Sequence, residues 1–200
     1  MHNKSRATTA AALAAIVALS GCGNSDSNDA NSTPTAQTAQ TAVDTATQDS
    51  HNQADVDFAQ GMIPHHEQAV EMSDILLAKP DIDPRVAQLA EEIKAAQAPE
   101  IEQLQGWLTQ WGAPAASDHG MEGMHGMMSE QDIAELRDAQ GTEASRLFLT
   151  QMIEHHDGAV IMAQTEIDSG QFSDAVAMAR DIISTQQQEI DHMREILQSL

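Results

Sequence analysis

The feature that most constrains this chain is an internal repeat centred on paired histidines. The sequence Met-Ile-Pro-His-His at 62–66 returns as Met-Ile-Glu-His-His at 152–156, and each copy continues into Ala-Val-x-Met. At helical spacing the Met and His side chains of each copy fall within an arc of about 120°. Each copy therefore presents imidazole and thioether groups on one face of a helix.

Helical periodicity begins near Ala54 and continues to the C-terminus. The predicted helices span 54–78, 84–111, 129–140, 142–169 and 173–200, the third being short. Asp83 followed by proline predicts one helix start, and Gly112 predicts the end of that helix. Pro64 and Pro99 lie inside two of these helices and should kink them.

The repeat extends beyond the histidines. Residues 86–93 align with 175–182, and Gln-x-x-Glu-Ile occurs at both 97–101 and 186–190. Two helical hairpins that cannot each bury an apolar stripe alone should pack as an all-α, antiparallel four-helix bundle. Its repeat halves would span about 54–112 and 142–200, joined by a loop and short helix at 113–141. We expect the two histidine helices to face each other near a pseudo-twofold axis.

The N-terminal quarter predicts export and anchoring. Residues 1–21 have a basic start and a short apolar run, as in a signal peptide, and Leu-Ser-Gly-Cys at 19–22 resembles a bacterial lipobox. Cleavage would leave an acylated Cys22 at the start of a Ser-, Thr-, Asn- and Gln-rich disordered tether, 22–53. The domain would then begin at residue 54, on the extracytoplasmic face of a membrane or at the cell surface. The alternative is an ordinary cleaved signal with an incidental cysteine.

Charge and cysteine content exclude several classes of function. Nine Lys and Arg residues against thirty-one Asp and Glu give a formal charge of −22, which disfavours binding to nucleic acid or anionic lipid headgroups. Cys22 is the only cysteine, so the folded domain offers no thiolate. A soft metal would have to be bound by methionine and histidine.

Histidine and methionine together favour copper, with Cu(I) preferred over Cu(II) and silver satisfying the same donors. The main candidate ligands are His65, His66, His155, His156, Met62, Met72, Met152 and Met162. The alternative for the methionines is ordinary core packing. The alternative for the histidines is a buried imidazole bonded to a carboxylate such as Glu67 or Asp157, or to one on a neighbouring helix.

A Gly-, His- and Met-rich loop supplies secondary candidates. Because it is polar and Gly-rich, core packing does not account for all of its methionines, and we interpret it as an exchangeable capture segment. An alternative is that its methionines cap one end of the bundle. The loop contributes His119, Met121, Met124, His125, Met127 and Met128, and the last helix adds His192 and Met193 as further secondary candidates.

The doubled Met-Ile-x-His-His-x-x-Ala-Val-x-Met, the Gln-x-x-Glu-Ile that follows each copy, and Gly-Met-Met-Ser at 126–129 resemble the domain-of-unknown-function 305 (DUF305) family. The resemblance covers about 55–200. It implies a ferritin-like four-helix fold, export, and copper binding through Met and His.

These observations predict an exported copper-binding lipoprotein in copper tolerance, buffering or transfer, with a copper exporter or chaperone as its expected partner. No catalytic constellation is present, so enzyme activity is not expected. One alternative is a ferritin-like dinuclear iron or manganese oxidoreductase, for which Glu189-x-x-His192 has the right spacing but the first repeat has no equivalent. Another is a structural surface lipoprotein. If copper binds to the histidines, affinity should fall below a pH of about 6.5.

Overall fold

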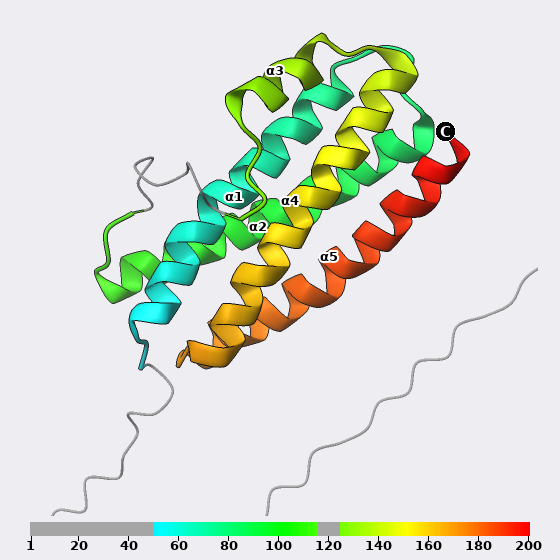
Figure 1. Cartoon of the computed structure of the whole chain (residues 1–200). Helices are drawn as coiled ribbons and strands as arrows, with labels where there is room; N and C mark the ends of the chain where they lie inside the picture. The colour runs from blue at the N-terminus through cyan, green and yellow to red at the C-terminus, as the bar shows by residue number, and fades with distance from the viewer. Residues whose placement is uncertain (1–49, 116–124) are drawn as a thin grey trace, which may run out of the picture. The chain divides into compact units, whose positions relative to one another are not determined.

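The computed structural model describes residues 50–115 and 125–200, all within the compact unit Val43–Leu200. In these ranges the chain forms five α-helices and no strand (Figure 1). They are α1 (Gln53–Leu77), α2 (Pro84–Trp111), α3 (Glu130–Asp138), α4 (Gly141–Ser169) and α5 (Ser173–Ser199). The all-α fold predicted from periodicity is confirmed. Among the described residues, no helix combines the length and apolar character needed to cross a membrane.

The helix boundaries have the local chemistry that the sequence predicts. The Asp83 side chain accepts the backbone N–H of the second helical residue of α2 at 2.9 Å, and Gly112 ends α2 with a φ of 65°. Ser129 forms a capping box at the start of α3. Both α1 and α2 continue as single helices through Pro64 and Pro99.

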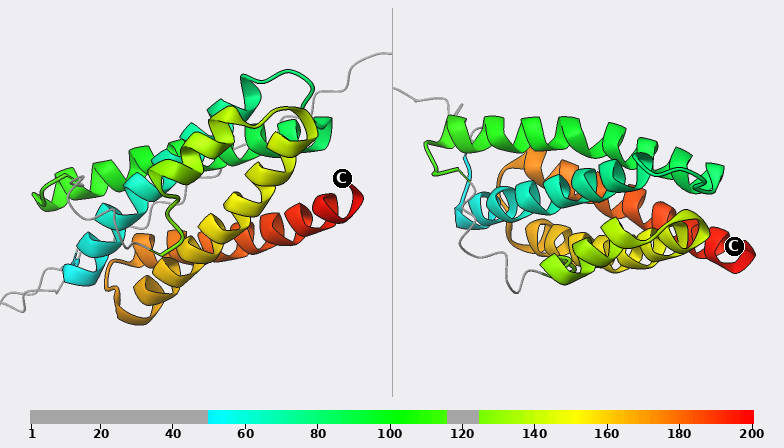
Figure 2. Two further views of the ribbon diagram at one scale, coloured as in Figure 1. Left: turned by 45° about the horizontal axis from the view of Figure 1, so that its top comes forward. Right: turned by 90° about the horizontal axis from the view of Figure 1, so that it is seen from above.

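The two histidine helices lie at the centre of the packing. Helix α1 packs against α2 in its own half, α4 packs against α5, and α1 and α4 pack against each other (Figures 1 and 2). Helix α3 lies across one end of the α1–α4 pair. The duplicated hairpins are therefore joined through the helices that carry the paired histidines.

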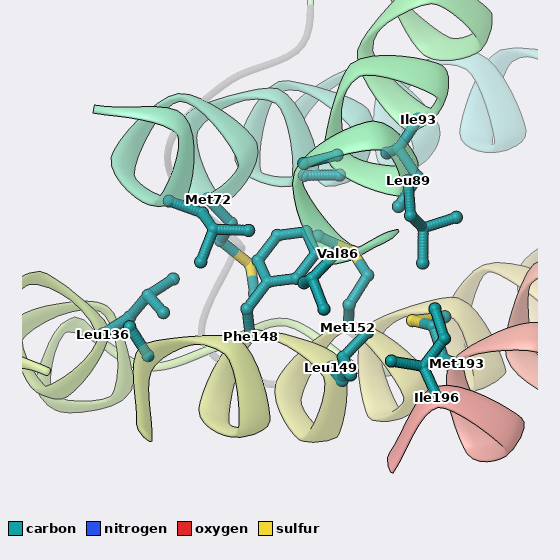
Figure 3. Close-up of a cluster of buried hydrophobic side chains, with 14 of the residues drawn as sticks. Met72, Val86, Leu89, Ile93, Leu136, Phe148, Leu149, Met152, Met193 and Ile196 are labelled. Carbon is teal, nitrogen blue, oxygen red and sulfur yellow. The ribbon is translucent and has the colours of Figure 1, made fainter. Parts of the chain in front are cut away.

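Two hydrophobic clusters fill the bundle, and each draws residues from all four long helices. The Phe148 cluster is centred on Met72, Leu89, Ile93, Leu136, Phe148, Met152, Ile190 and Met193 (Figure 3). The Trp107 cluster is centred on Phe58, Met62, Leu104, Trp107, Ala163, Phe172 and Ile182. On α1 the chain passes from the Trp107 cluster to the Phe148 cluster, and on α4 it passes in the opposite order, so these helices are antiparallel.

A short segment at 125–128 crosses the face where α1 meets α4. It approaches α4 so closely that a Cβ on Gly158 would overlap the His125 carbonyl, and a Cβ on Gly126 would lie 2.7 Å from the Glu154 carbonyl oxygen. On α1 the Gln68 side chain donates to the Met128 carbonyl at 2.9 Å and accepts the Met128 N–H at 2.8 Å. Glycine on one helix and glutamine on the other hold this segment in place.

A carboxyl pair links the start of α1 to the turn between α4 and α5. Buried Asp55 accepts the backbone N–H of Gln171 at 3.0 Å and of Phe172 at 2.9 Å. Burial by itself would raise the pKa of Asp55, but the backbone N–H groups that it accepts outweigh burial and lower it. Burial, together with the neighbouring Asp55, raises the pKa of Glu166 to about 8. Protonation of Glu166 avoids a second buried negative charge beside the Asp55 carboxylate.

Gly158→Ala should destabilise the protein by about 1–3 kcal/mol, because the new methyl group displaces the main chain at 125–126. The matched control is Gly106→Ala on α2, where a Cβ meets nothing within 4 Å and should add about 0.5–1 kcal/mol through helix propensity. Urea unfolding measures both effects, and hydrogen exchange at the Met128 amide should accelerate only in the first variant. Equal stabilisation by both substitutions would contradict this packing.

Glu166→Gln should flatten the pH dependence of stability between about pH 5 and 9. The folded-state pKa of Glu166 is raised from 4.5 to about 8, so its stabilising proton is fully present below 4.5 and is lost as pH rises through 8. Glutamine is neutral at every pH, so it keeps the uncharged state of this side chain without titrating. Urea midpoints at several pH values, compared with the exposed control Glu102→Gln, measure the difference, and the prediction fails if both variants follow the wild-type curve.

Candidate metal centre

The four repeat histidines meet in the middle of the bundle, and each has an exposed fraction of 0%. His65 on α1 and His155 on α4 are in contact, with ring centroids 3.7 Å apart and ring planes tilted by 35°. Within each helix the paired rings are 6.4 Å apart. The expected facing arrangement of the two histidine helices is thus present, with one imidazole from each half at the centre.

The second histidine of each pair is held by a carboxylate from the next helix. His66 Nε2 lies 2.7 Å from Glu100 Oε2, and His156 Nε2 lies 2.7 Å from Glu189 Oε2. The carboxylates suggested by sequence proximity do not have this role, because Glu67 and Asp157 are adjacent to the histidines in sequence but exposed. Their side chains leave the opposite face of the helix.

The central pair has no such partner. Among the described residues, neither ring nitrogen of His65 or His155 makes a hydrogen bond. Burial, reinforced by the neighbouring histidines, lowers the pKa of His65 to about 3, while backbone groups of His125 and His155 oppose the shift. Burial likewise lowers the pKa of His155 well below 6.5. Both rings are therefore neutral at physiological pH, with lone pairs available to a cation.

Two glutamines complete a layer of buried polar side chains. Gln97 and Gln186 precede the two glutamates by one helical turn, so each shares a helix face with its glutamate. Both are nearly fully buried, and amide atoms of each have no hydrogen-bond partner in the described structure. We call the following set the polar layer: His65, His66, Gln97, Glu100, His155, His156, Gln186 and Glu189. On every long helix it separates the residues of the Phe148 cluster from those of the Trp107 cluster.

The described side chains do not form a preassembled metal cage. Within residues 50–115 and 125–200, no three His, Cys, Asp or Glu side chains form a group that could hold a metal ion. A structural zinc site, which needs four converging donors, therefore finds no preformed cage of these side chains in that part of the chain. Among the residues that the structure describes, six imidazole nitrogens of the layer are buried without a hydrogen-bond partner. Buried polar atoms in this condition are commonly satisfied by water or an ion.

The four methionines of the repeat divide between the two clusters. Met72 and Met152 belong to the Phe148 cluster, where Figure 3 shows them on either side of Phe148. Met62 and the half-buried Met162 belong to the Trp107 cluster. Two thioethers thus flank each side of the polar layer, and all four contribute to core packing.

The secondary candidates are more scattered. His119, Met121 and Met124 lie outside the described residues. His125 is exposed, Met127 is half-buried, and Met128 is buried beside α1. His192 faces solvent whereas Met193 is buried in the Phe148 cluster, so this pair does not form a joint site.

Exposure of His192 also removes the geometric basis for a dinuclear iron or manganese centre. Such centres require the Glu-x-x-His side chains to project together into the bundle. Here Glu189 contacts His156, and His192 lies 3.9 Å from Glu195 at the surface. The spacing that suggested this alternative is incidental to a charged helix.

Sequence reasoning missed the roles of Gln97, Glu100, Gln186 and Glu189. Their signal was present, because Gln-x-x-Glu-Ile is repeated in the helix after each histidine pair. Repetition identified these residues as equivalent, but their contact with the histidines depends on how the two helices of a hairpin pack.

Known proteins share both the sequence and the architecture of this bundle. Residues 55–197 match the family described as "Domain of unknown function (DUF305)". A DUF305 protein from Streptomyces coelicolor, described as secreted, is 36% identical, with 73% of this chain and 91% of that chain covered and a TM-score of 0.69. A DUF305 fragment from Deinococcus radiodurans is 33% identical, with 74% and 98% covered and a TM-score of 0.69.

A third solved structure carries metal. CopM in its Cu(I)-bound form is 30% identical, with 72% of this chain and 96% of that chain covered and a TM-score of 0.62. CopM has also been solved in Cu(II)-bound and Ag-bound forms. A comparison with curated proteins finds no match. With its ferritin-like all-α bundle and a family match over most of its length, this chain belongs to the DUF305 family.

Proposed function

We propose that this protein is an exported lipoprotein that binds copper as Cu(I) in the polar layer, for copper tolerance, buffering or transfer. The observation that carries the proposal is the contact between His65 and His155, two buried neutral imidazoles whose ring nitrogens have no partner in the described structure. Support comes also from CopM, a relative whose structures include Cu(I)-bound, Cu(II)-bound and Ag-bound forms.

The electrostatics of the layer suit a monovalent soft cation. Imidazole nitrogen is a good ligand for copper, and binding to a neutral ring requires no proton to leave. Glu100 and Glu189 contribute carboxylates at the edge of the layer, with side chains 25% and 14% exposed. A bound cation would therefore gain nitrogen donors and nearby negative charge in a site from which water is largely excluded.

Thioethers would act as additional soft donors. Met62, Met72, Met152 and Met162 lie on the two histidine helices, within two turns of the polar layer. The Gly-His-Met loop ends at Met128, and its main chain at 125–126 lies against the backbone of α4 beside His155. We infer that copper passes from loop thioethers to layer imidazoles by exchange of one neutral donor at a time, and that silver follows the same route.

Export and anchoring belong to the same proposal. Acylation at Cys22 would hold the bundle at the extracytoplasmic face of a membrane, where a copper exporter or a periplasmic chaperone would deliver or receive the ion. The activity is ligand exchange rather than catalysis.

His65→Leu combined with His155→Leu should reduce Cu(I) affinity by at least 100-fold, because the central nitrogen donors are lost. The same variant should be as stable as the wild type or more stable by about 1–3 kcal/mol without metal, since unpartnered buried polar atoms are replaced by apolar groups. Competition with a chromogenic Cu(I) chelator under reducing conditions measures affinity, and urea unfolding measures stability.

His192→Leu is the matched control, because it removes an exposed imidazole from the neighbouring helix. It should leave the tight Cu(I) affinity unchanged. If the double variant still bound Cu(I) tightly, the tight site would not use His65 and His155. Weak binding by all three proteins would favour a structural surface lipoprotein.

The central histidines should also make the metal-free protein sensitive to acid. Below the unfolded-state pKa of about 6.5 the unfolded chain takes up protons that folded His65, with a pKa of about 3, cannot bind. Stability is therefore lost as pH falls from about 6.5 toward 3. Urea unfolding should show a larger loss between pH 7 and pH 5 in the wild type than in the double leucine variant, and equal losses would contradict neutral burial of these rings.

The lowered pKa values of the central histidines change the pH dependence of copper binding that the sequence predicts. Unperturbed histidines would lose copper below a pH of about 6.5, but the rings of His65 and His155 remain neutral well below that value in the folded state. Protonation of these two rings therefore competes with copper only at more acidic pH.

A further inference from the structure

The contacts made by Glu100 and Glu189 determine which nitrogen of His66 and His156 carries hydrogen. An ionised carboxylate only accepts hydrogen bonds, so the imidazole must donate its Nε2–H. A neutral imidazole has a single N–H group, and its other nitrogen then carries a lone pair. In both residues that other nitrogen, Nδ1, is buried and has no partner in the described structure.

The same geometry occurs twice, in two halves that share the motif but differ in most of their sequence. Each distance is 2.7 Å, each contact uses Nε2, and each glutamate lies on the helix that follows the histidine helix. Each glutamate retains some exposure whereas its histidine has none. The carboxylates thus hold the imidazoles from the more exposed side of the contact, and Nδ1 is the buried ring nitrogen that stays without a partner in the described structure.

We propose that Glu100 and Glu189 are positioning residues of the copper site, which fix His66 and His156 in the Nε2–H tautomer so that Nδ1 is the metal-binding atom. This inference rests on the proposed copper function and adds its donor atoms. A carboxylate on the far nitrogen also increases the basicity of a ligating imidazole, as in other metal sites where a carboxylate orients a histidine.

The inference assigns different roles to the two histidines of each pair. His66 and His156 have a fixed ring orientation and a fixed donor nitrogen. Among the described residues, His65 and His155 have no hydrogen bond to set their tautomer, so either nitrogen of each ring is available to an ion. His66 and His156 would set the position of the ion, and His65 and His155 would complete its coordination through whichever ring nitrogen faces it.

The test uses nitrogen NMR of the protein labelled with ¹⁵N-histidine, first without metal and then with Ag(I), which is diamagnetic. Without metal, His66 and His156 should show protonated Nε2 and unprotonated Nδ1. Ag(I) should shift the Nδ1 resonances and leave Nε2 protonated. A shift at Nε2 instead, or an Nδ1–H tautomer in the metal-free protein, would overturn the inference while leaving copper binding intact. If the protein bound neither Ag(I) nor Cu(I), both the proposed copper function and the assignment of Nδ1 as the donor would be wrong.

Substitution separates positioning from a purely structural role. Glu100→Gln with Glu189→Gln should convert both rings to mixed tautomers and weaken Cu(I) binding by about 10–100-fold. The control, Glu102→Gln with Glu195→Gln, removes the same charge from exposed positions on the same helices. It should leave both the histidine tautomers and the Cu(I) affinity unchanged. If the site variant lowered only the urea midpoint, with tautomers and affinity unchanged, the glutamates would be structural and the inference wrong.

Discussion

The main constraint on this structure is a layer of polar side chains buried in the middle of a helical bundle, which the hydrophobic packing on either side must offset. An unpartnered buried polar group costs about 1–3 kcal/mol, and the whole stability of a domain is commonly only about 5–15 kcal/mol. The layer is tolerated because hydrophobic clusters centred on Phe148 and Trp107 fix all four helices on either side of it. Conserving this arrangement in both halves of a duplicated chain makes sense if the layer has a function that an apolar core would not provide.

Departures from the repeat are as informative as the repeat itself. Gln68 and Gly158 occupy equivalent positions, two residues after each histidine pair. Gln68 holds the backbone of Met128 through two hydrogen bonds, and Gly158 leaves room for the main chain at 125–126. A symmetric bundle could not hold one connecting segment across its symmetric face, so the two halves differ where that segment lies.

The sequence predicted the helices well because periodicity, caps and stop residues are local signals. It predicted that His65 and His155 would face each other because a duplication implies equivalent positions. It did not predict the partners of His66 and His156, because Glu100 and Glu189 are more than thirty residues away and become neighbours only through hairpin packing. It also could not separate His192 from Met193, since their different environments depend on the rotation of α5.

The methionine sulfurs and the histidine nitrogens of the repeat lie in different layers of the bundle, and this arrangement affects which metal ion the polar layer would bind. The repeat methionines belong to the two hydrophobic clusters, whereas the imidazoles lie in the polar layer between them, so an ion in the layer meets nitrogen first. Zinc would accept imidazole, but the described His, Asp and Glu side chains form no preassembled group of three or more donors for it. Cu(I) and Ag(I) need fewer donors and gain from nearby thioethers. If copper binds in the layer as we propose, the softness of these donors favours Cu(I) and Ag(I) over zinc.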